Sequence, residues 1–238
     1  MAGARRGLPF ADDSAAKPAA WRWAVALLSA VAGFAALLLV EPALGMLAAA
    51  LLFVGIPLAG LFVLTEGRLG LILPPPSGRD VAVGLGFGLL NLIAIPLLGW
   101  LITRLLPTAP NPVGDLLSGL TPGAIPGFFA TTGIQLVGEE LVTVIPFLAV
   151  MVLMRGIGFP RGAAVAIGAL GAALAFAAMH LPTYQWHVLQ TVVLIGGARL
   201  ILLGAYLVTR NLWASVIAHI FNDWMLFGSL ILLARAAT

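Results

Sequence analysis

The sequence contains no cysteine and very few charged residues. Of its 238 residues only 9% are Asp, Glu, Lys or Arg, whereas a soluble domain carries about 25%. The absence of cysteine excludes disulfides, thiolate zinc sites, iron–sulfur clusters and cysteine nucleophiles. The scarcity of charge excludes a water-exposed surface over most of the chain. Any metal ion would need His, Glu, Asp or Asn ligands.

Hydrophobic residues make up 61% of the chain and form long, unbroken runs. A membrane-spanning helix needs about 20 apolar residues, and the runs reach this length. They lack the alternation within short segments that is typical of a transmembrane β-barrel. The sequence therefore predicts an all-α, polytopic transmembrane bundle whose main solvent is the lipid bilayer.

Seven spans are expected, or eight if the segment 121–138 forms a separate re-entrant or interfacial piece. Residues 1–20 are expected to form a cytoplasmic tail, and residues 21–238 a single transmembrane domain. The expected spans lie at about 23–40, 43–65, 81–105, 127–154, 161–181, 187–208 and 212–234.

Lys and Arg occur mostly singly, at the ends of apolar runs. Positive residues in short loops favour the cytoplasmic side, and most of them fall on the same side as the N-terminus. We therefore expect a multi-pass protein of the cell membrane with a cytoplasmic N-terminus. The net charge of +3 comes from these scattered residues, so no nucleic-acid partner is expected.

Small residues recur at helical spacing in two of the expected spans. Gly84 and Gly88 form a GxxxG pair, and Ala164, Gly168 and Ala172 form a similar series. Such patterns let helix backbones approach closely in lipid, so they predict tight packing.

Only a few ionisable side chains lie within the apolar runs. Such groups are costly in lipid and usually face the interior of a bundle, where they have a partner or a function. His219 and Asp223 are four residues apart and share a helix face, with Asn222 close to it. The full set is Glu139, Glu140, His180, Arg199, His219 and Asp223.

Two adjacent carboxylates and two histidines, brought from three helices, could activate a water molecule. One glutamate would act as a general base. The histidines could bind a metal that polarises water, or they could stabilise an oxyanion directly. The HExxH pattern of zinc-protease helices is absent.

At these residues the sequence resembles the CPBP family of intramembrane proteases, which includes the CAAX prenyl endopeptidases. The family pattern is EExxxR, then FxxxH, then HxxxN or HxxxD, each on a separate membrane helix. The resemblance covers about residues 127–227. The matching residues, in chain order, are Glu139 with Glu140, Phe176 with His180, and His219 with Asp223.

One position departs from the family pattern. The arginine of the first motif falls on Val144 here. Arg199, on a neighbouring span, is expected to lie near a carboxylate and to replace that arginine in space.

The resemblance implies hydrolysis of a peptide bond in a membrane-associated peptide or protein. Glu139 or Glu140 would activate water, and His180 would help to bind that water or a metal. His219, with Asp223 or Asn222, would stabilise the tetrahedral oxyanion. If a divalent metal such as zinc is bound, the resemblance implies Glu139, His180 and His219 as its ligands.

Two other functional classes stay open. The departure at Val144 favours a non-catalytic immunity or assembly factor on the same scaffold. A small cation or proton transporter could use the glutamate pair, but it would show polar groups in both halves of the chain, and here they lie in the second half.

Counting residues along the spans gives conflicting depths for the site. At 1.5 Å per residue, Glu140 lies about 22 Å from Arg155 and His180 about 28 Å from Arg161. His219 lies only about 14 Å from Arg210. Convergence therefore requires the last span to be tilted or to begin deeper in the bundle.

Overall fold

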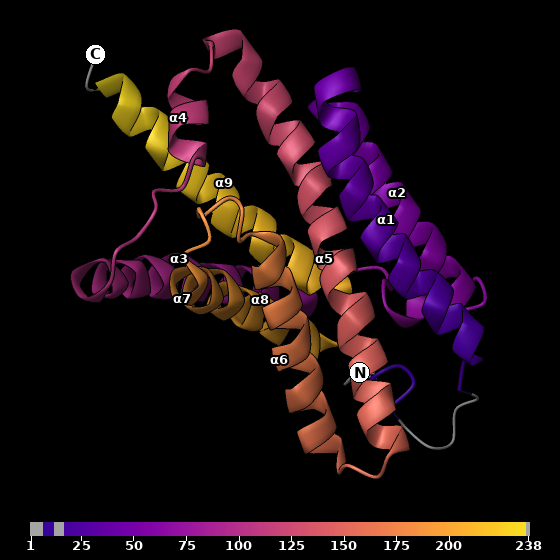
Figure 1. Cartoon of the computed structure of the whole chain (residues 1–238). Coiled ribbons are helices and arrows are strands. Elements are labelled where there is room, and N and C mark those ends of the chain that lie inside the picture. Colours follow the sequence, from indigo (N-terminus) through magenta and orange to yellow (C-terminus); the bar gives the residue numbers. More distant parts are fainter. Residues whose placement is uncertain (1–6, 12–16, 237–238) are drawn as a thin grey trace.

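The computed structural model describes residues 7–11 and 17–236, and within them every regular element is helical (Figure 1). Seven helices are long and apolar enough to cross a membrane. The predicted all-α bundle and the count of seven spans are confirmed. The long helices are α1 (Ala20–Leu44), α2 (Met46–Leu64), α3 (Gly78–Leu105), α5 (Ile125–Gly156), α6 (Arg161–Met179), α8 (Gly197–Thr209) and α9 (Leu212–Ala236).

Short elements connect or extend these helices. The sixth span, Val188–Thr209, is continuous and consists of α7 (Val188–Thr191), the π-helical turn η3 (Val192–Gly196) and α8. The 3-10 turn η2 (Pro122–Ala124) leads directly into α5, so the segment 121–138 begins the fourth span and adds no eighth one. The turn η1 (Leu69–Leu71) and the short helix α4 (Val113–Ser118) lie in loops.

Part of the expected tail packs onto the bundle. Leu8, Phe10 and Ala11 are buried, and the ring of Phe10 meets that of Trp23 edge-on with centroids 5.5 Å apart. Residues 1–6 and 12–16 of the expected tail lie outside the described residues.

Helix α5 holds two groups of helices together. α1 and α2 pair with each other and pack on α5, while α3, α8 and α9 pack mainly among themselves; α6 lies along α5. α3 and α8 run across the view in Figure 1, whereas α5 and α6 run from top to bottom. The spans are therefore far from parallel, and α5 carries the glutamate pair to the junction of the two groups.

The predicted close packing at GxxxG is present between α3 and α9. A Cβ atom added at Gly84 would lie 2.7 Å from the carbonyl oxygen of Ala214, and one at Gly88 would lie 2.7 Å from that of Ala218. Larger side chains do not fit at this distance, so the two glycines set how closely α3 approaches the stretch of α9 that ends at His219.

The second small-residue series also packs as predicted. Ala164, Gly168 and Ala172 on α6 are buried. A Cβ atom at Gly168 would lie 2.9 Å from the carbonyl oxygen of Phe147 on α5. These contacts fix α6 against α5, and with it the position of His180, which directly follows α6 as its C-cap.

The start of α9 is anchored to the start of α3. Asn211 accepts a hydrogen bond from the backbone N–H of Trp213 (3.1 Å) and donates one to Asp80 near the start of α3 (3.0 Å). The N–H of Leu212 donates to the carbonyl of Ile72 (2.9 Å). α8 runs across the bundle and not along α5 (Figure 1). The hydrogen bonds of Asn211 and Leu212 therefore set the position at which α9 begins.

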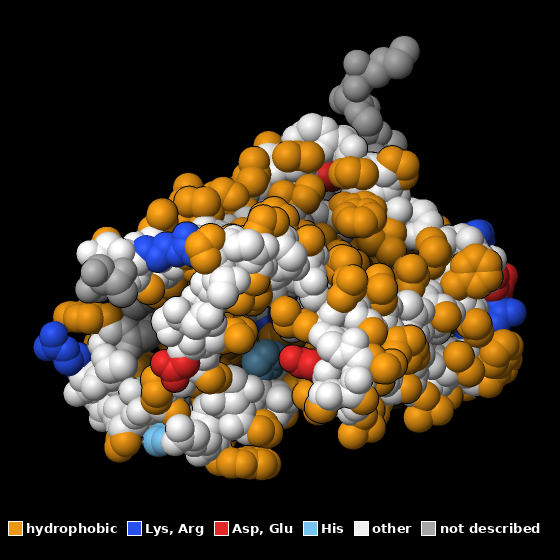
Figure 2. All heavy atoms as spheres, turned by 90° about the horizontal axis from the view of Figure 1, so that it is seen from above, with side chains coloured by type: hydrophobic (Ala, Val, Ile, Leu, Met, Phe, Trp, Pro, Cys, Tyr) orange, Lys and Arg blue, Asp and Glu red, His pale blue; other side chains and the backbone are white. Residues whose placement is uncertain are grey.

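Large apolar side chains cover much of the outside of the bundle. Leu28, Leu39, Leu97 and Leu232 are among many that are exposed. Figure 2 shows hydrophobic side chains spread across the visible surface, with charged ones sparse. An exterior of this kind suits lipid, and the protein is a multi-pass membrane protein.

Candidate functional site

A cavity of about 560 Å³ lies between the helices, and most of the ionisable groups singled out in the sequence line it. Its walls come from α3, α4, α5, α6, the sixth span and α9, with the first residue of α2 and the loops before α4 and after α6. From above, the surface is hollowed near its middle, and acidic and histidine side chains are visible there (Figure 2). The ionisable lining residues are Glu139, His180, Arg199, His219 and Asp223.

Glu140 is the exception, because it lies behind the cavity wall and is fully buried. Its carboxylate forms an ion pair with Arg199 and accepts a hydrogen bond from the hydroxyl of Ser215 (2.5 Å). Nδ1 of His219 lies 2.8 Å from the same carboxylate. Three partners therefore occupy Glu140, and it fixes the positions of α8 and α9 relative to α5.

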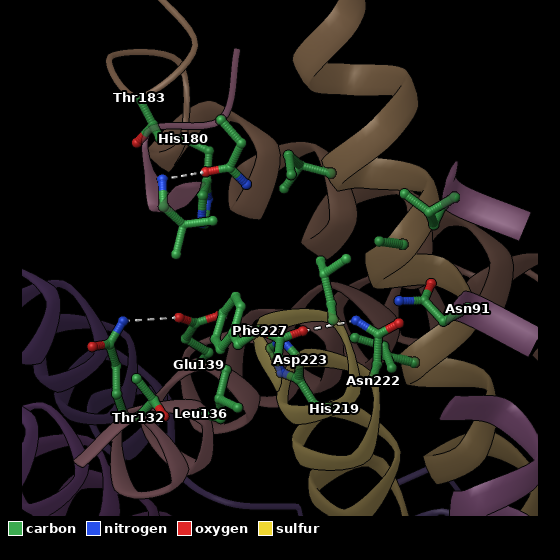
Figure 3. Close-up of a pocket in the computed structure, with 18 of the residues that line it drawn as sticks. Asn91, Thr132, Leu136, Glu139, His180, Thr183, His219, Asn222, Asp223 and Phe227 are labelled. Carbon is green, nitrogen blue, oxygen red and sulfur yellow. Dashed lines mark hydrogen bonds and ion pairs between the residues drawn. The ribbon is translucent and has the colours of Figure 1, made fainter. Parts of the chain in front are cut away.

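Glu139 is adjacent in sequence but has a different environment. Its side chain is 13% exposed and reaches the cavity, where Figure 3 shows it facing open space. Gln135 donates a hydrogen bond to Oε1 at 3.3 Å. Oε2 has only looser neighbours, Arg199 at 3.5 Å and His219 at 3.7 Å. Glu139 is thus held in place while its side chain stays partly exposed on the cavity.

Arg199 supplies the positive charge between the two glutamates. It is only 2% exposed, pairs with both carboxylates, and lies over the ring of Phe176 at 3.7 Å. The expectation that Arg199 lies near a carboxylate is confirmed. Val144, where the family has its arginine, is fully buried in the apolar core. The positive charge beside the two glutamates therefore comes from α8.

His219 lies among three carboxylates. Because a carboxylate only accepts hydrogen bonds, Nδ1 donates to Glu140. Nε2 lies 3.7 Å from both Glu139 and Asp223. Asn222 donates to the second oxygen of Asp223 at 2.7 Å and is itself mostly buried. Nε2 is therefore the ring nitrogen of His219 that can form a hydrogen bond with a molecule in the cavity.

The depth count was wrong for His219, because it treated the spans as parallel. The contact between His219 and Glu140 shows that the two residues lie at the same level. Because α8 runs across the bundle, α9 begins close to the level of Glu140, and His219 reaches that level two helical turns after Leu212 (Figure 1).

His180 lies across the cavity from the other groups (Figure 3). Its Nδ1 donates to the carbonyl oxygen of Phe176 at 2.9 Å, which leaves Nε2 available. The His180 and Phe176 rings are 4.6 Å apart, so Phe176 contacts both His180 and Arg199. The structure therefore brings Glu139, His180, His219 and Asp223 to one cavity, but not to one point.

The expected metal ligands do not form a metal site in this arrangement. Among the described residues, no three His, Asp or Glu side chains are placed to hold one ion. Glu139 is instead paired with Arg199, and His180 lies on the opposite wall. The donor set of Glu139, His180 and His219 does not fit zinc as it stands.

Several polar residues of the site were missed because the sequence analysis considered only ionisable groups within the spans. Ser215, Gln135 and Asn91 all lie in apolar runs, so a search for any hydrogen-bonding side chain would have found them. Tyr184, in the loop after α6, also lines the cavity and is hydrogen-bonded by Asn111 at 3.2 Å. Burial raises the pKa of Tyr184, and the nearby charge of Asp223 adds to this rise.

The fold and the site together define a class of protein: a polytopic helical membrane protein with a carboxylate–arginine–histidine cluster on an internal cavity. Residues 121–225 match the family described as type II CAAX prenyl endopeptidase Rce1-like. Over these residues the match confirms the resemblance to the CPBP family, and at the family level it supports a membrane endopeptidase of the CAAX-protease type. No curated protein sequence and no solved structure matches the chain.

Proposed function

We propose that the protein is an intramembrane endopeptidase in which Glu139 activates the attacking water. The observation that carries this proposal is the difference between the two glutamates. Glu140 is enclosed by Arg199, Ser215 and His219, whereas Glu139 has an accessible oxygen on the cavity. A general base needs such an oxygen within reach of water.

The proposed reaction follows from the placement of the groups. Glu139 takes a proton from water as the resulting hydroxide attacks the carbonyl carbon of the substrate. The oxyanion that forms is stabilised by the Nε2–H of a doubly protonated His219, whose Nδ1–H donates to Glu140 and whose ring Asp223 helps to orient. The protonated Glu139 then gives its proton to the leaving amine as the C–N bond breaks.

His180 has a separate role in this proposal. Its free Nε2 faces Glu139 across the cavity, so a bound peptide would lie between the two side chains. In that position Nε2 can hydrogen-bond the attacking water or the substrate. His180 therefore acts only when the cavity is occupied, which accounts for its distance from the other groups.

The family described as a CAAX prenyl endopeptidase suggests the first substrate to test. Two reporter peptides would be used, each with a fluorophore and a quencher at its ends: one with a farnesylated CAAX terminus and one unmodified apolar membrane-spanning peptide. We expect the purified protein in lipid nanodiscs to cleave at least one of them. Mass spectrometry in H₂¹⁸O should then show one ¹⁸O atom in the new carboxylate.

If neither peptide is cleaved while the protein stays folded, the non-catalytic scaffold becomes the better account. The presence of the cavity beside an accessible carboxylate supports the catalytic one, because a scaffold has no need of buried ionisable groups around open space.

A further inference from the structure

Asn91 is a buried amide that neither the family motifs nor the proposed reaction uses. It lies on α3, outside the segment that matches the family. The residue is only 2% exposed, yet it lines the cavity. Within the described part of the chain its Oδ1 has no hydrogen-bond partner. Figure 3 shows Asn91 beside Asn222, on the cavity wall formed by α3 and α9.

An unpaired amide in this position is costly. Burying an amide without a hydrogen bond destabilises the folded state, and lipid offers no replacement partner. Asn in a membrane helix normally bonds to a neighbouring helix. The next cavity-lining residues along α3, Leu92 and Ile95, are apolar, so an apolar side chain is compatible with this wall. The amide therefore indicates a ligand that supplies the missing bond.

The other polar groups of the cavity indicate what kind of ligand this is. Apart from the charged side chains and Asn222, they are uncharged amides and hydroxyls, which both donate and accept hydrogen bonds. Such groups match the N–H and C=O groups of a peptide main chain better than a charged ligand. They are Asn111, Thr132, Gln135, Thr183 and Tyr184.

A peptide that is cut inside a membrane has a particular need for these partners. Its scissile bond must leave the helical conformation, which frees main-chain N–H and C=O groups that lipid cannot satisfy. An amide side chain on the cavity wall can pair with either type of group.

We propose that the Asn91 carboxamide is a substrate-binding group that hydrogen-bonds the main chain of an unwound peptide in the cavity. This inference rests on the proposed function for the identity of the ligand. It extends the site to α3, which carries none of the family motifs. It also assigns Asn91 to substrate binding and not to proton transfer.

The test measures binding apart from cleavage. The Glu139→Gln variant would be titrated with the two fluorescent reporter peptides in nanodiscs, alone and combined with Asn91→Leu. We expect Asn91→Leu to weaken binding about three- to tenfold, as for one lost hydrogen bond. Asn91→Leu should leave the Tm unchanged or raise it. Leu90→Ala, on the exposed face of the same helix, is the control and should not change binding.

Peptides with one amide replaced by an ester identify the bond directly. At one position the ester should weaken binding to Glu139→Gln, and with Asn91→Leu added the same ester should have no further effect. Equal binding with and without Asn91→Leu, or no binding of either peptide, overturns the proposal. A lower Tm of Asn91→Leu with unchanged binding would assign the amide a purely structural role. Binding without cleavage by the unaltered protein would instead contradict the proposed function and leave the Asn91 site standing.

Discussion

At the residue scale, Glu139 and Glu140 differ in what surrounds them although they are neighbours in sequence. Successive residues of an α-helix point in directions about 100° apart, as the 3.6-residue turn requires. On α5 this turn directs Glu140 into the packed junction with α8 and α9, and Glu139 into the cavity. One residue thus holds three helices together while the other stays accessible.

Replacing Arg199 tests the charge balance of the cluster. In Arg199→Met both carboxylates lose their buried counter-charge, so we expect a loss of roughly 3–5 kcal/mol of stability and a loss of cleavage. Thermal unfolding in detergent and the reporter assay would measure both. Arg104→Met is the matched control, because Arg104 also lies over an aromatic ring, that of Trp100, but is exposed. An unchanged Tm for Arg199→Met would contradict the role assigned to Arg199.

The two histidines should behave differently when each is replaced by alanine. His219 is buried and bonded to Glu140, so His219→Ala should lower both the Tm and the cleavage rate. His180 bonds only to a backbone carbonyl of its own helix, so His180→Ala should keep the Tm and reduce cleavage by about 100-fold. Equal losses of Tm would mean that His180 is structural.

The membership of this site could largely be predicted from sequence, because ionisable residues are rare in apolar runs. Glu139, His219, Asp223 and Arg199 were all found in that way and do lie together. The assignment of the two glutamates could not be predicted, since it depends on the rotation of α5. Whether Glu139, His180 and His219 could bind one metal ion could not be predicted either, because the distance of His180 from the other two depends on the width of the cavity.

At the element scale, the position of α9 decides whether His219 reaches the glutamates. Its start is tied to α3 through Asn211 and Asp80, and its next turns pack directly on Gly84 and Gly88. The seven spans followed from length and hydropathy alone. Their tilts did not, because tilt is set by packing between helices and a residue count along one helix contains no information about it.

A methyl group at the α3–α9 contact should displace α9. In Gly88→Ala the new Cβ would lie 2.7 Å from the carbonyl of Ala218, and we expect a cost of about 1–3 kcal/mol. The cleavage rate should fall because His219 follows Ala218 directly. Gly86→Ala on the same helix has open space and should match the unaltered protein in Tm and rate. Equal behaviour of the two variants would refute the close contact.

At the scale of the whole molecule, a lipid-facing bundle contains a cavity of about 560 Å³ with a cluster of charged side chains on its wall. Glu139, Arg199 and Asp223 lie on this cavity and Glu140 lies directly behind it, while the outside is largely apolar. In the proposed reaction, water and the peptide would meet in this cavity.

Metal chelation tests the donor geometry on the intact protein. Because Glu139 is paired with Arg199 and His180 lies across the cavity, we expect cleavage to persist after incubation with EDTA or 1,10-phenanthroline. The rate would be measured on the reporter peptides before and after chelation. Loss of activity that added zinc restores would show that the side chains rearrange to bind a metal.

The most direct test of the central claim compares the reporter cleavage rates of Glu139→Gln and Glu140→Gln, with the Tm of each variant measured alongside. The account predicts that Glu139→Gln loses about 10²- to 10⁴-fold in rate at a Tm close to that of the unaltered protein. Glu140→Gln should lower the Tm, because Arg199 and His219 lose their buried partner. Cleavage by Glu139→Gln near the unaltered rate would contradict the assignment of Glu139 as the group that activates water.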